Sequence, residues 1–308
     1  MKKIKFIFIH AFFIAVCSII GCIFITQLNN YFVKKEELNK FFLNEPEYQL
    51  AKAVLLKNNG KIKRLCKKNP EWIKRSFEEE YYSVLQYAVS NGQTKSVEAL
   101  LATGMNPNVV DYSGETPIFT AVDQLYAMVN KIDYSKIVHL LIKYGADCNF
   151  HKKKDLEKTG ITNGGETPLM RSTYFYGTKY QKILIETDHA DINDKTKYGV
   201  TAAVTALWMG NIKGAHYLIA ECKADVTEPF YFYDEKYEWN KIQIYPVMLV
   251  KVLKNYPEDS ENYKLMQEII AEFINQGIDD FESPVPDDVL MILNEHCSAI
   301  RLTKIINH

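Results

Sequence analysis

The sequence predicts an all-α repeat solenoid preceded by one transmembrane helix. A short string recurs three times, as Ser-Gly-Glu-Thr-Pro-Ile at 113–118, Gly-Gly-Glu-Thr-Pro-Leu at 164–169 and Tyr-Gly-Val-Thr-Ala-Ala at 198–203. Its spacing is regular, because Thr116 stands 33 positions after Ser83 and Thr201 stands 34 positions after Thr167. A long apolar run also opens the chain. Because one short unit cannot bury its own apolar face, recurring units are expected to stack.

Four five-residue codas accompany these strings. They are Gly-Met-Asn-Pro-Asn at 104–108, Gly-Ala-Asp-Cys-Asn at 145–149, His-Ala-Asp-Ile-Asn at 189–193 and Lys-Ala-Asp-Val-Thr at 223–227. Strings and codas together resemble the ankyrin repeat, a unit of about 33 residues with a turn and two helices. The resemblance covers residues 47–300 and is strongest across 83–227. It implies helix-turn-helix units joined by β-turn or hairpin loops, with protein binding rather than catalysis as the expected function.

The first element is the apolar run at residues 6–28. Its 23 positions suffice to cross a bilayer core of about 30 Å as a helix. Lys2, Lys3 and Lys5 precede the run, and this bias places the N-terminus in the cytoplasm and the repeats on the far side. We therefore predict a signal-anchor at residues 1–28 that spans a bacterial inner membrane, with the array on its periplasmic side.

A second interpretation of this segment is a lipoprotein signal. Ile19-Ile20-Gly21-Cys22 resembles the bacterial lipoprotein cleavage box, in which the cysteine becomes lipidated. A cleaved secreted form is a third alternative, and all three export the array. Residues 29–46, rich in charged helix formers, are expected to form a juxtamembrane linker.

The array proper is predicted at residues 47–279, as about six units. The first is a degenerate cap around residues 51–66, since terminal units of a solenoid have one face in water. The next four are expected at 83–108, from Gly114, at 167–193 and at 201–227, interrupted by insertions at 151–165 and 227–245. A divergent sixth unit opens at Tyr245, and residues 280–308 carry a C-terminal capping helix that starts at Pro286.

One departure from the family pattern is consistent. The histidine of the family's Thr-Pro-Leu-His string is replaced throughout, by Gln86, Phe119, Met170, Val204 and Met248. This replacement is expected to remove a local hydrogen bond at the helix starts, where Thr116 is a candidate helix cap and Pro117 occupies the first turn.

Several function classes are excluded. The net charge is −1, and only four of the 37 basic residues are arginine, so the composition argues against a nucleic-acid partner. The six cysteines show no spacing of a zinc or redox site. No histidine has a cysteine or serine partner at motif spacing. We therefore predict no catalytic residues, no metal, no cofactor and no small-molecule substrate.

The predicted partner is another protein, bound through the concave face and its loops. Candidate residues at loop tips are Tyr112, Ser113, Glu115, Glu166, Lys197 and Tyr198. Candidates at the ends of inner helices are Tyr176, Trp208 and Met209. The second insertion adds Phe230, Tyr231, Phe232, Tyr233, Tyr237 and Trp239. Aromatic residues and methionine at exposed sites are typical of interface cores. The alternative is that Tyr176 and Trp208 pack between neighbouring repeats, and that the insertion folds back on the array.

The predicted function is that of a membrane-tethered, exported scaffold. Resemblance to bacterial proteins of this architecture further implies an immunity role, in which the scaffold neutralises a toxic effector. A stabiliser of a periplasmic enzyme and a secreted host-directed effector are the alternatives, and the sequence does not name the partner.

Overall fold

The structure is a computed structural model that describes residues 34–36, 38–75, 82–123, 127, 132–153, 159–160, 165–175, 177–187, 189–234 and 242–297. The predicted signal-anchor, Cys22 and residues 29–33 of the predicted linker lie outside these ranges. Within them, no helix is both long enough and apolar enough to cross a membrane.

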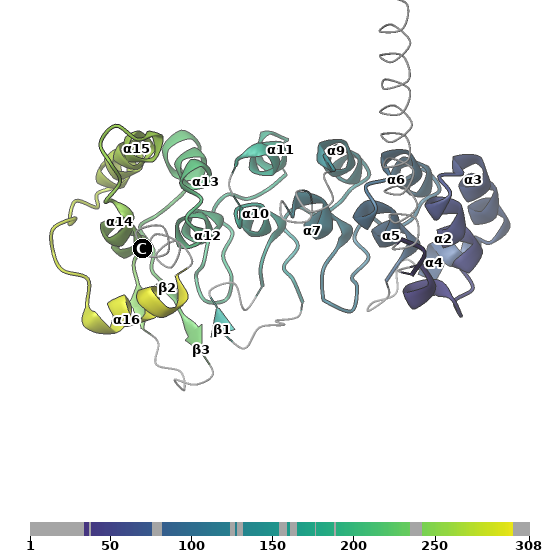
Figure 1. The fold of residues 1–308 in the computed structure, drawn as a ribbon, viewed down its shortest axis with the longest axis horizontal. Helices are drawn as coiled ribbons and strands as arrows, with labels where there is room; N and C mark the ends of the chain where they lie inside the picture. Colours follow the sequence, from purple (N-terminus) through teal and green to yellow (C-terminus); the bar gives the residue numbers. More distant parts are fainter. Residues whose placement is uncertain are drawn as a thin grey trace, which may run out of the picture.

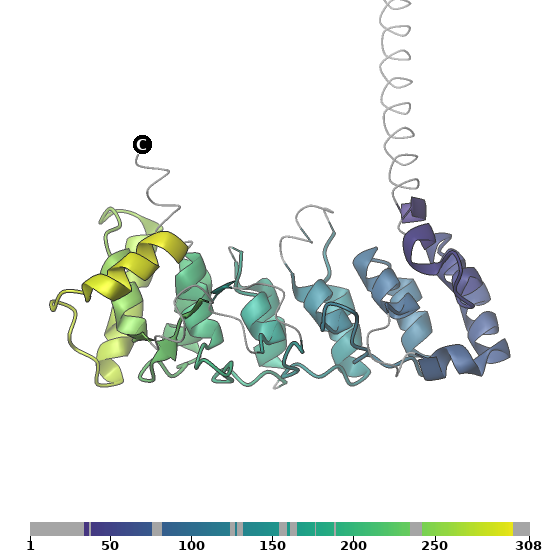
Figure 2. The ribbon, with the colours of Figure 1, turned by 90° about the horizontal axis from the view of Figure 1, so that it is seen from below.

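The helices stand side by side in two rows (Figures 1 and 2). The inner row is α2 (Tyr48–Leu55), α5 (Val84–Ser90), α7 (Pro117–Val122), α10 (Pro168–Arg171), α12 (Ala202–Met209) and α14 (Pro246–Leu253). The outer row is α3 (Asn59–Lys68), α6 (Thr94–Leu101), α9 (Ser135–Lys143), α11 (Lys179–Glu186), α13 (Ile212–His216) with its π-helical continuation η1 (Tyr217–Glu221), and α15 (Glu261–Asn275). A short helix, α4 (Pro70–Arg75), follows the first pair, and α16 (Asp287–His296) follows the last. The prediction of a repeat solenoid is confirmed.

Loops that we call finger loops join each outer helix to the next inner helix, below the two rows in Figure 1. Short strands form where the two predicted insertions extend these loops. They are β1 (Thr159–Gly160), β2 (Phe230–Tyr231), β3 (Tyr233–Asp234) and β4 (Gln243–Ile244). β1 pairs with β3 and β2 pairs with β4, both antiparallel.

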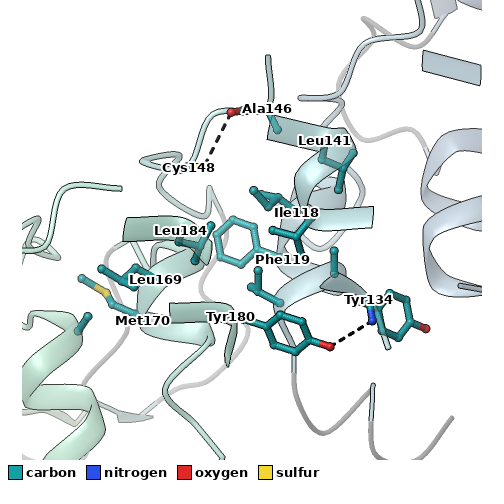
Figure 3. Packing of buried hydrophobic residues seen from close by; sticks show 14 of the residues in the cluster. Ile118, Phe119, Tyr134, Leu141, Ala146, Cys148, Leu169, Met170, Tyr180 and Leu184 are labelled. Carbon is teal, nitrogen blue, oxygen red and sulfur yellow. Dashed lines mark hydrogen bonds between the residues drawn. The ribbon is translucent and has the colours of Figure 1, made fainter. Parts of the chain in front are cut away.

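The core lies between the two rows of helices. Figure 3 shows one section of it, where Ile118 of α7, Leu141 of α9, Leu169 of α10 and Leu184 of α11 gather, each no more than 1% exposed. Residues from two consecutive units thus share one apolar layer. Stacking of this kind is what makes a unit stable that could not fold alone.

Three inner helices have capped starts although the family histidine is missing. Ser83 and Gln86 form a reciprocal capping box at the start of α5, and the Gln86 side chain also donates to the carbonyl oxygen of Glu115 at 3.2 Å. Thr167 and Thr201 accept hydrogen bonds from the third backbone N–H of α10 and α12. These three helices therefore keep regular, capped starts without the family histidine.

Thr116 is the exception. It precedes α7 in extended conformation, but its hydroxyl makes no capping bond, so its predicted capping role is wrong. This oxygen is buried without a hydrogen-bond partner within the described structure. Pro117 occupies the first turn of α7 as predicted and fixes a helical φ there.

The predicted linker is also partly wrong. Residues 34–36 and 38–42, which we call the N-terminal helical segment, are helical. Leu38 and Phe42 are at most 1% exposed. The Tyr87 hydroxyl of α5 donates to the carbonyl oxygen of Lys34 at 2.9 Å, and Lys34 Nζ donates to the carbonyl of Asn91. From Lys34 onward the chain therefore belongs to the folded body, because two apolar residues on one face of this segment are buried in the core and one of them, Phe42, meets Tyr87 of α5.

Asparagines of the codas tie each unit to the next. Asn108 Nδ2 donates to the carbonyl oxygen of Gly145 at 2.8 Å, and Asn108 Oδ1 accepts from the backbone of Asp147 at 2.8 Å. Asn149 repeats both bonds one unit later, to His189 and Asp191. A carboxamide suits this position because it carries a donor and an acceptor on one planar group.

We call this series of asparagine bonds between successive codas the asparagine ladder, and it ends where the units diverge. Asn193 accepts from the backbone of Asp225, but threonine stands at the equivalent position 227. Gln276 of the following unit takes over there, accepting from the Val226 backbone and donating to the carbonyl oxygen of Ala224. A carboxamide is thus kept at this junction, although it comes from the opposite unit.

Replacing Asn149 by alanine should lower the free energy of unfolding by about 1–2 kcal/mol, because two backbone groups of the next coda lose their protein partner. Urea denaturation followed by circular dichroism measures this. Asn255→Ala, at an exposed loop position, serves as the control and should change it by less than about 0.5 kcal/mol. Equal effects of the two substitutions would contradict a role for the ladder.

Candidate protein-binding surface

The finger loops are rigid at their bases. Asp111 Oδ1 accepts from the backbone N–H groups of Ser113 and Glu115, at 2.9 and 3.2 Å, and from the Ser113 hydroxyl. Thr196 has the same role in the fifth unit, where its hydroxyl accepts from the Tyr198 and Val200 backbones. Each loop therefore presents its tip in a fixed position.

The tips carry the most accessible of the predicted binding residues. Tyr112 is 53% exposed, Lys197 is exposed, and Ser113 and Tyr198 are half-buried. The Lys197 ammonium lies 4.9 Å from the centre of the Tyr198 ring. These four residues lie at the loop tips, where the prediction expected them, and their binding role stays a prediction.

Glu115 and Glu166 are placed differently. Both converge on Arg171 of α10, at 2.7–2.9 Å, and Glu166 makes a two-bond fork with the guanidinium. Lys152 adds a second cation, 2.8 Å from Glu115, and Asp123 Oδ2 lies 3.4 Å from Arg171. Glu166 is only 4% exposed. We call these five residues the Arg171 network.

Charges within the Arg171 network stabilise one another. Burial raises the pKa of Glu115, but the positive charges of Arg171 and Lys152 outweigh burial and hold that pKa below its ordinary value. Burial lowers the pKa of Arg171, yet hydrogen bonds and charge from Glu166, with the charge of Glu115, raise it overall. Sequence reasoning missed this network because its members are far apart in the chain, with Arg171 56 residues after Glu115.

The two insertions meet each other. β1 of the first pairs with β3 of the second, joining Thr159 to Asp234. The second insertion also crosses the finger loop of the fifth unit, where the Tyr231 N–H donates to the Tyr198 carbonyl at 2.8 Å. A β-carbon at Gly199 would lie 2.8 Å from a backbone oxygen of Pro229, so glycine is needed at this crossing.

Aromatic residues at the base of the second insertion pack inward. Trp208 is 3% exposed, Phe230 0% and Phe232 8%. The Phe232 ring stacks on Trp208 with centroids 5.7 Å apart, and the Phe230 ring meets Trp208 edge-on. The predicted exposure of these three residues is therefore wrong, and the alternative of packing within the array holds for them.

The reason is the C-terminal helix α16, which returns over the inner row. The His296 ring lies tilted against Phe232 with centroids 4.7 Å apart, and the Cys297 thiol, just after α16, donates to the Trp208 carbonyl. Tyr231 and Met209 stay half-buried. Tyr176, Tyr237, Trp239 and the side chain of Tyr233 lie outside the described residues.

The described residues offer little chemistry. No group of three or more His, Cys, Asp or Glu side chains among them could hold a metal ion. Cys66, Cys148 and Cys297 are buried free thiols, and burial raises the pKa of Cys148 to about 12. Burial also raises the pKa of Cys66, so the Cys66 and Cys148 thiols remain protonated at neutral pH. All three buried thiols pack as small apolar residues.

Replacing Trp208 by alanine should lower the free energy of unfolding by about 3–5 kcal/mol, because it empties a site enclosed by two phenylalanine rings. Thermal melting of the variant measures this against Met291→Ala, at a 45% exposed position of α16. An unchanged melting temperature for Trp208→Ala would show that the side chain is accessible after all.

The Arg171 network should make stability depend on acidity. Because the folded-state pKa of Glu115 lies below its ordinary value of 4.5, the carboxylate stabilises the fold above about pH 4.5. This stability is lost as pH falls through the folded pKa.

Urea denaturation at pH 7 and pH 3.5 checks this dependence. Glu115→Gln should be less stable than the parent at pH 7, with a smaller loss on acidification. Glu98→Gln, at an exposed site on α6, should follow the parent at both values. A parent and Glu115→Gln variant with parallel pH profiles would contradict the assignment.

Comparison with known proteins agrees with this architecture. The family model described as ankyrin repeats, three copies, matches residues 50–152 and 125–229. The ankyrin repeat domain of human ASB11 is similar to the chain with 18% identity and a TM-score of 0.47, covering 71% of this chain and 82% of that one. Among curated proteins, none gives a significant match. Since the family model spans more than half of the sequence, the chain belongs to the ankyrin repeat family.

Proposed function

We propose that the chain is a membrane-tethered, exported scaffold that binds another protein through the middle of its inner face. By inner face we mean the side formed by the inner helices and the finger loops. Ankyrin repeats are typically protein-binding scaffolds. The observation that carries the proposal is the selective covering of this face by the chain's own ends.

One end of the inner face is occupied by the N-terminal helical segment. It packs on α5 through Leu38 and Phe42, and the Phe42 ring meets Tyr87 edge-on at 5.6 Å. The other end is occupied by α16, which contacts the backbone of Trp208 in α12. A partner therefore meets α7 and α10, with the finger loops beside them.

That middle portion has the chemistry of a specific interface. Thr120 of α7 and Arg171 of α10 are half-buried there, with Tyr174 5.5 Å from the guanidinium of Arg171. The Tyr112 and Tyr198 rings flank it on the finger loops. A charged centre with tyrosines at its border supports binding of a polar surface, since arginine and tyrosine are enriched at interface centres.

Site-specific photo-crosslinking tests the docking surface. A benzoylphenylalanine at Tyr198 should give one discrete adduct in cells, and the same residue at His139 should give none. His139 is exposed on α9 in the outer row and is the matched control. Equal adducts at both positions would show that contact is nonspecific, and adducts at His139 alone would move the docking site to the outer row.

The tether rests on the apolar run at residues 6–28 and the three lysines before it. A reporter active only outside the cytoplasm should be active when fused after His308, and the chain should stay with membranes at alkaline pH. Cys22→Ala should leave this association intact if the run spans uncleaved. Loss of fatty-acid labelling together with a change in precursor size would favour the lipoprotein alternative instead.

We further propose an immunity role, in which the bound partner is a toxic effector that the scaffold neutralises. This role requires that a toxin kills cells that lack the chain and spares cells that carry it. Survival that does not depend on the chain would leave the scaffold function and remove the immunity role.

A further inference from the structure

The two ends of the array carry opposite charge. Residues 48–75, which form α2, α3 and α4, contain nine lysines and arginines and a single acidic residue. Residues 256–297, which include α15 and α16, contain eleven aspartates and glutamates and one lysine. The chain's net charge of −1 conceals this separation. Figure 1 places these regions at opposite ends of the stack.

Most of the basic side chains on α3 are exposed and form no ion pair with the described residues. Six cations on α3 and the turn before it form no ion pair within the described residues, namely Lys57, Lys61, Lys63, Arg64, Lys67 and Lys68. All but Lys61 are exposed. α2 and α3 pack on α5 and α6, and α4 contacts α3. Within the described residues no further helix pair lies beyond them, so their outward side forms the end surface of the stack. We call this surface the basic end.

The acidic end is only partly neutralised. Several of its carboxylates pair with cations of neighbouring helices, as Glu261 does with Lys213 and Asp280 with Lys251. Five exposed ones have no ion pair within the described residues, namely Glu258, Asp259, Asp279, Asp287 and Asp288. Asp279 lies in the α15–α16 connection, which runs around the far end in Figure 1, and Asp287 and Asp288 begin α16.

Apolar side chains are exposed at the same two ends. Within the described residues, six large hydrophobic residues are more than a third exposed. Leu43 and Leu56 lie at the basic end, at 57% and 53%, while Ile274 and Met291 lie at the acidic end, at 52% and 45%. An exposed apolar centre with a charged border is the usual composition of a protein interface.

We propose that the basic end of one chain docks on the acidic end of a second copy, head to tail. The charges are complementary in sign and similar in number, and each end supplies apolar contacts. Because the two surfaces differ, the contact is heterologous and leaves one free end of each kind, so further copies add. The unpaired cations are almost all lysines, which act as point charges and suit carboxylates without demanding forked geometry.

An anionic membrane and a nucleic acid are the two alternative ligands for a basic surface. We favour a second copy because the chain's own acidic end carries both the matching negative charges and two exposed apolar residues, Ile274 and Met291. The inference does not depend on the tether, since both surfaces belong to the folded array.

Charge-swap pairing tests the proposal on the full chain in a nonionic detergent. The first variant carries Lys63→Glu, Arg64→Glu and Lys67→Glu at the basic end. The second carries Glu258→Lys, Asp259→Lys and Asp279→Lys at the acidic end. A matched control carries Lys95→Glu, Lys136→Glu and Lys143→Glu, at exposed sites of the middle units. Light scattering with detergent correction counts chains per particle.

The parent and the control should self-associate at low salt and dissociate at about 0.5 M salt, where screening shortens the reach of charge to a few ångströms. Each swap variant alone should self-associate roughly a hundredfold more weakly, because like charges then face each other. Mixing the two variants should restore association, which also shows that both are folded. Association through the apolar N-terminal run would be the same in all four proteins.

Two results would overturn the proposal. One is a parent chain that shows no salt-sensitive association, and the other is a pair of swap variants that associate no better mixed than alone. Vesicles of phosphatidylglycerol and a single-stranded oligonucleotide serve as competing probes. Saturable binding of either by the parent, lost in the first variant without any self-association, would assign the basic end to that occupant instead.

Discussion

An ankyrin unit cannot complete the turn that follows its outer helix, and the fold depends on a neighbour that does so. The coda leaves a backbone carbonyl and an N–H exposed, and the carboxamide one unit earlier satisfies both, as Asn108 and Asn149 do. Where the coda asparagine is absent at Thr227, Gln276 supplies the same group from the other side. Apolar stacking holds the units together, but these bonds fix their register.

Features that repeat along the chain could be predicted from the sequence. The helix pairs, Pro117 in its first turn and the loop-tip positions of Tyr112 and Lys197 follow from the period, because each copy confirms the others. Trp208 could not be placed this way. Its ring packs against Phe230 and Phe232 of an irregular insertion, and Phe232 in turn contacts His296, 64 positions later. No period connects these residues. The pairing of β1 with β3 joins two irregular insertions and is equally invisible to a repeat pattern.

The predicted exposure of Glu115 and Glu166 was wrong for a different reason. Glu115 and Glu166 occupy tip positions that are usually exposed, but Arg171 and Lys152 draw both carboxylates inward. A buried guanidinium needs several acceptors, and these come from two finger loops and from Asp123, the residue that follows α7. Composition alone likewise hides the polarity of the array, since the basic and acidic ends cancel in the net charge.

The N-terminal helical segment also determines how the array would carry mechanical load. A pull on the chain ahead of Lys34 acts first on the contacts that Lys34 and Phe42 make with Tyr87 of α5. Because these contacts are arranged along one helical segment, they share the load and must break at the same time when the segment is pulled along its length. The terminal pair α2 and α3, which follows this segment in the chain, is thereby shielded from being peeled off the stack.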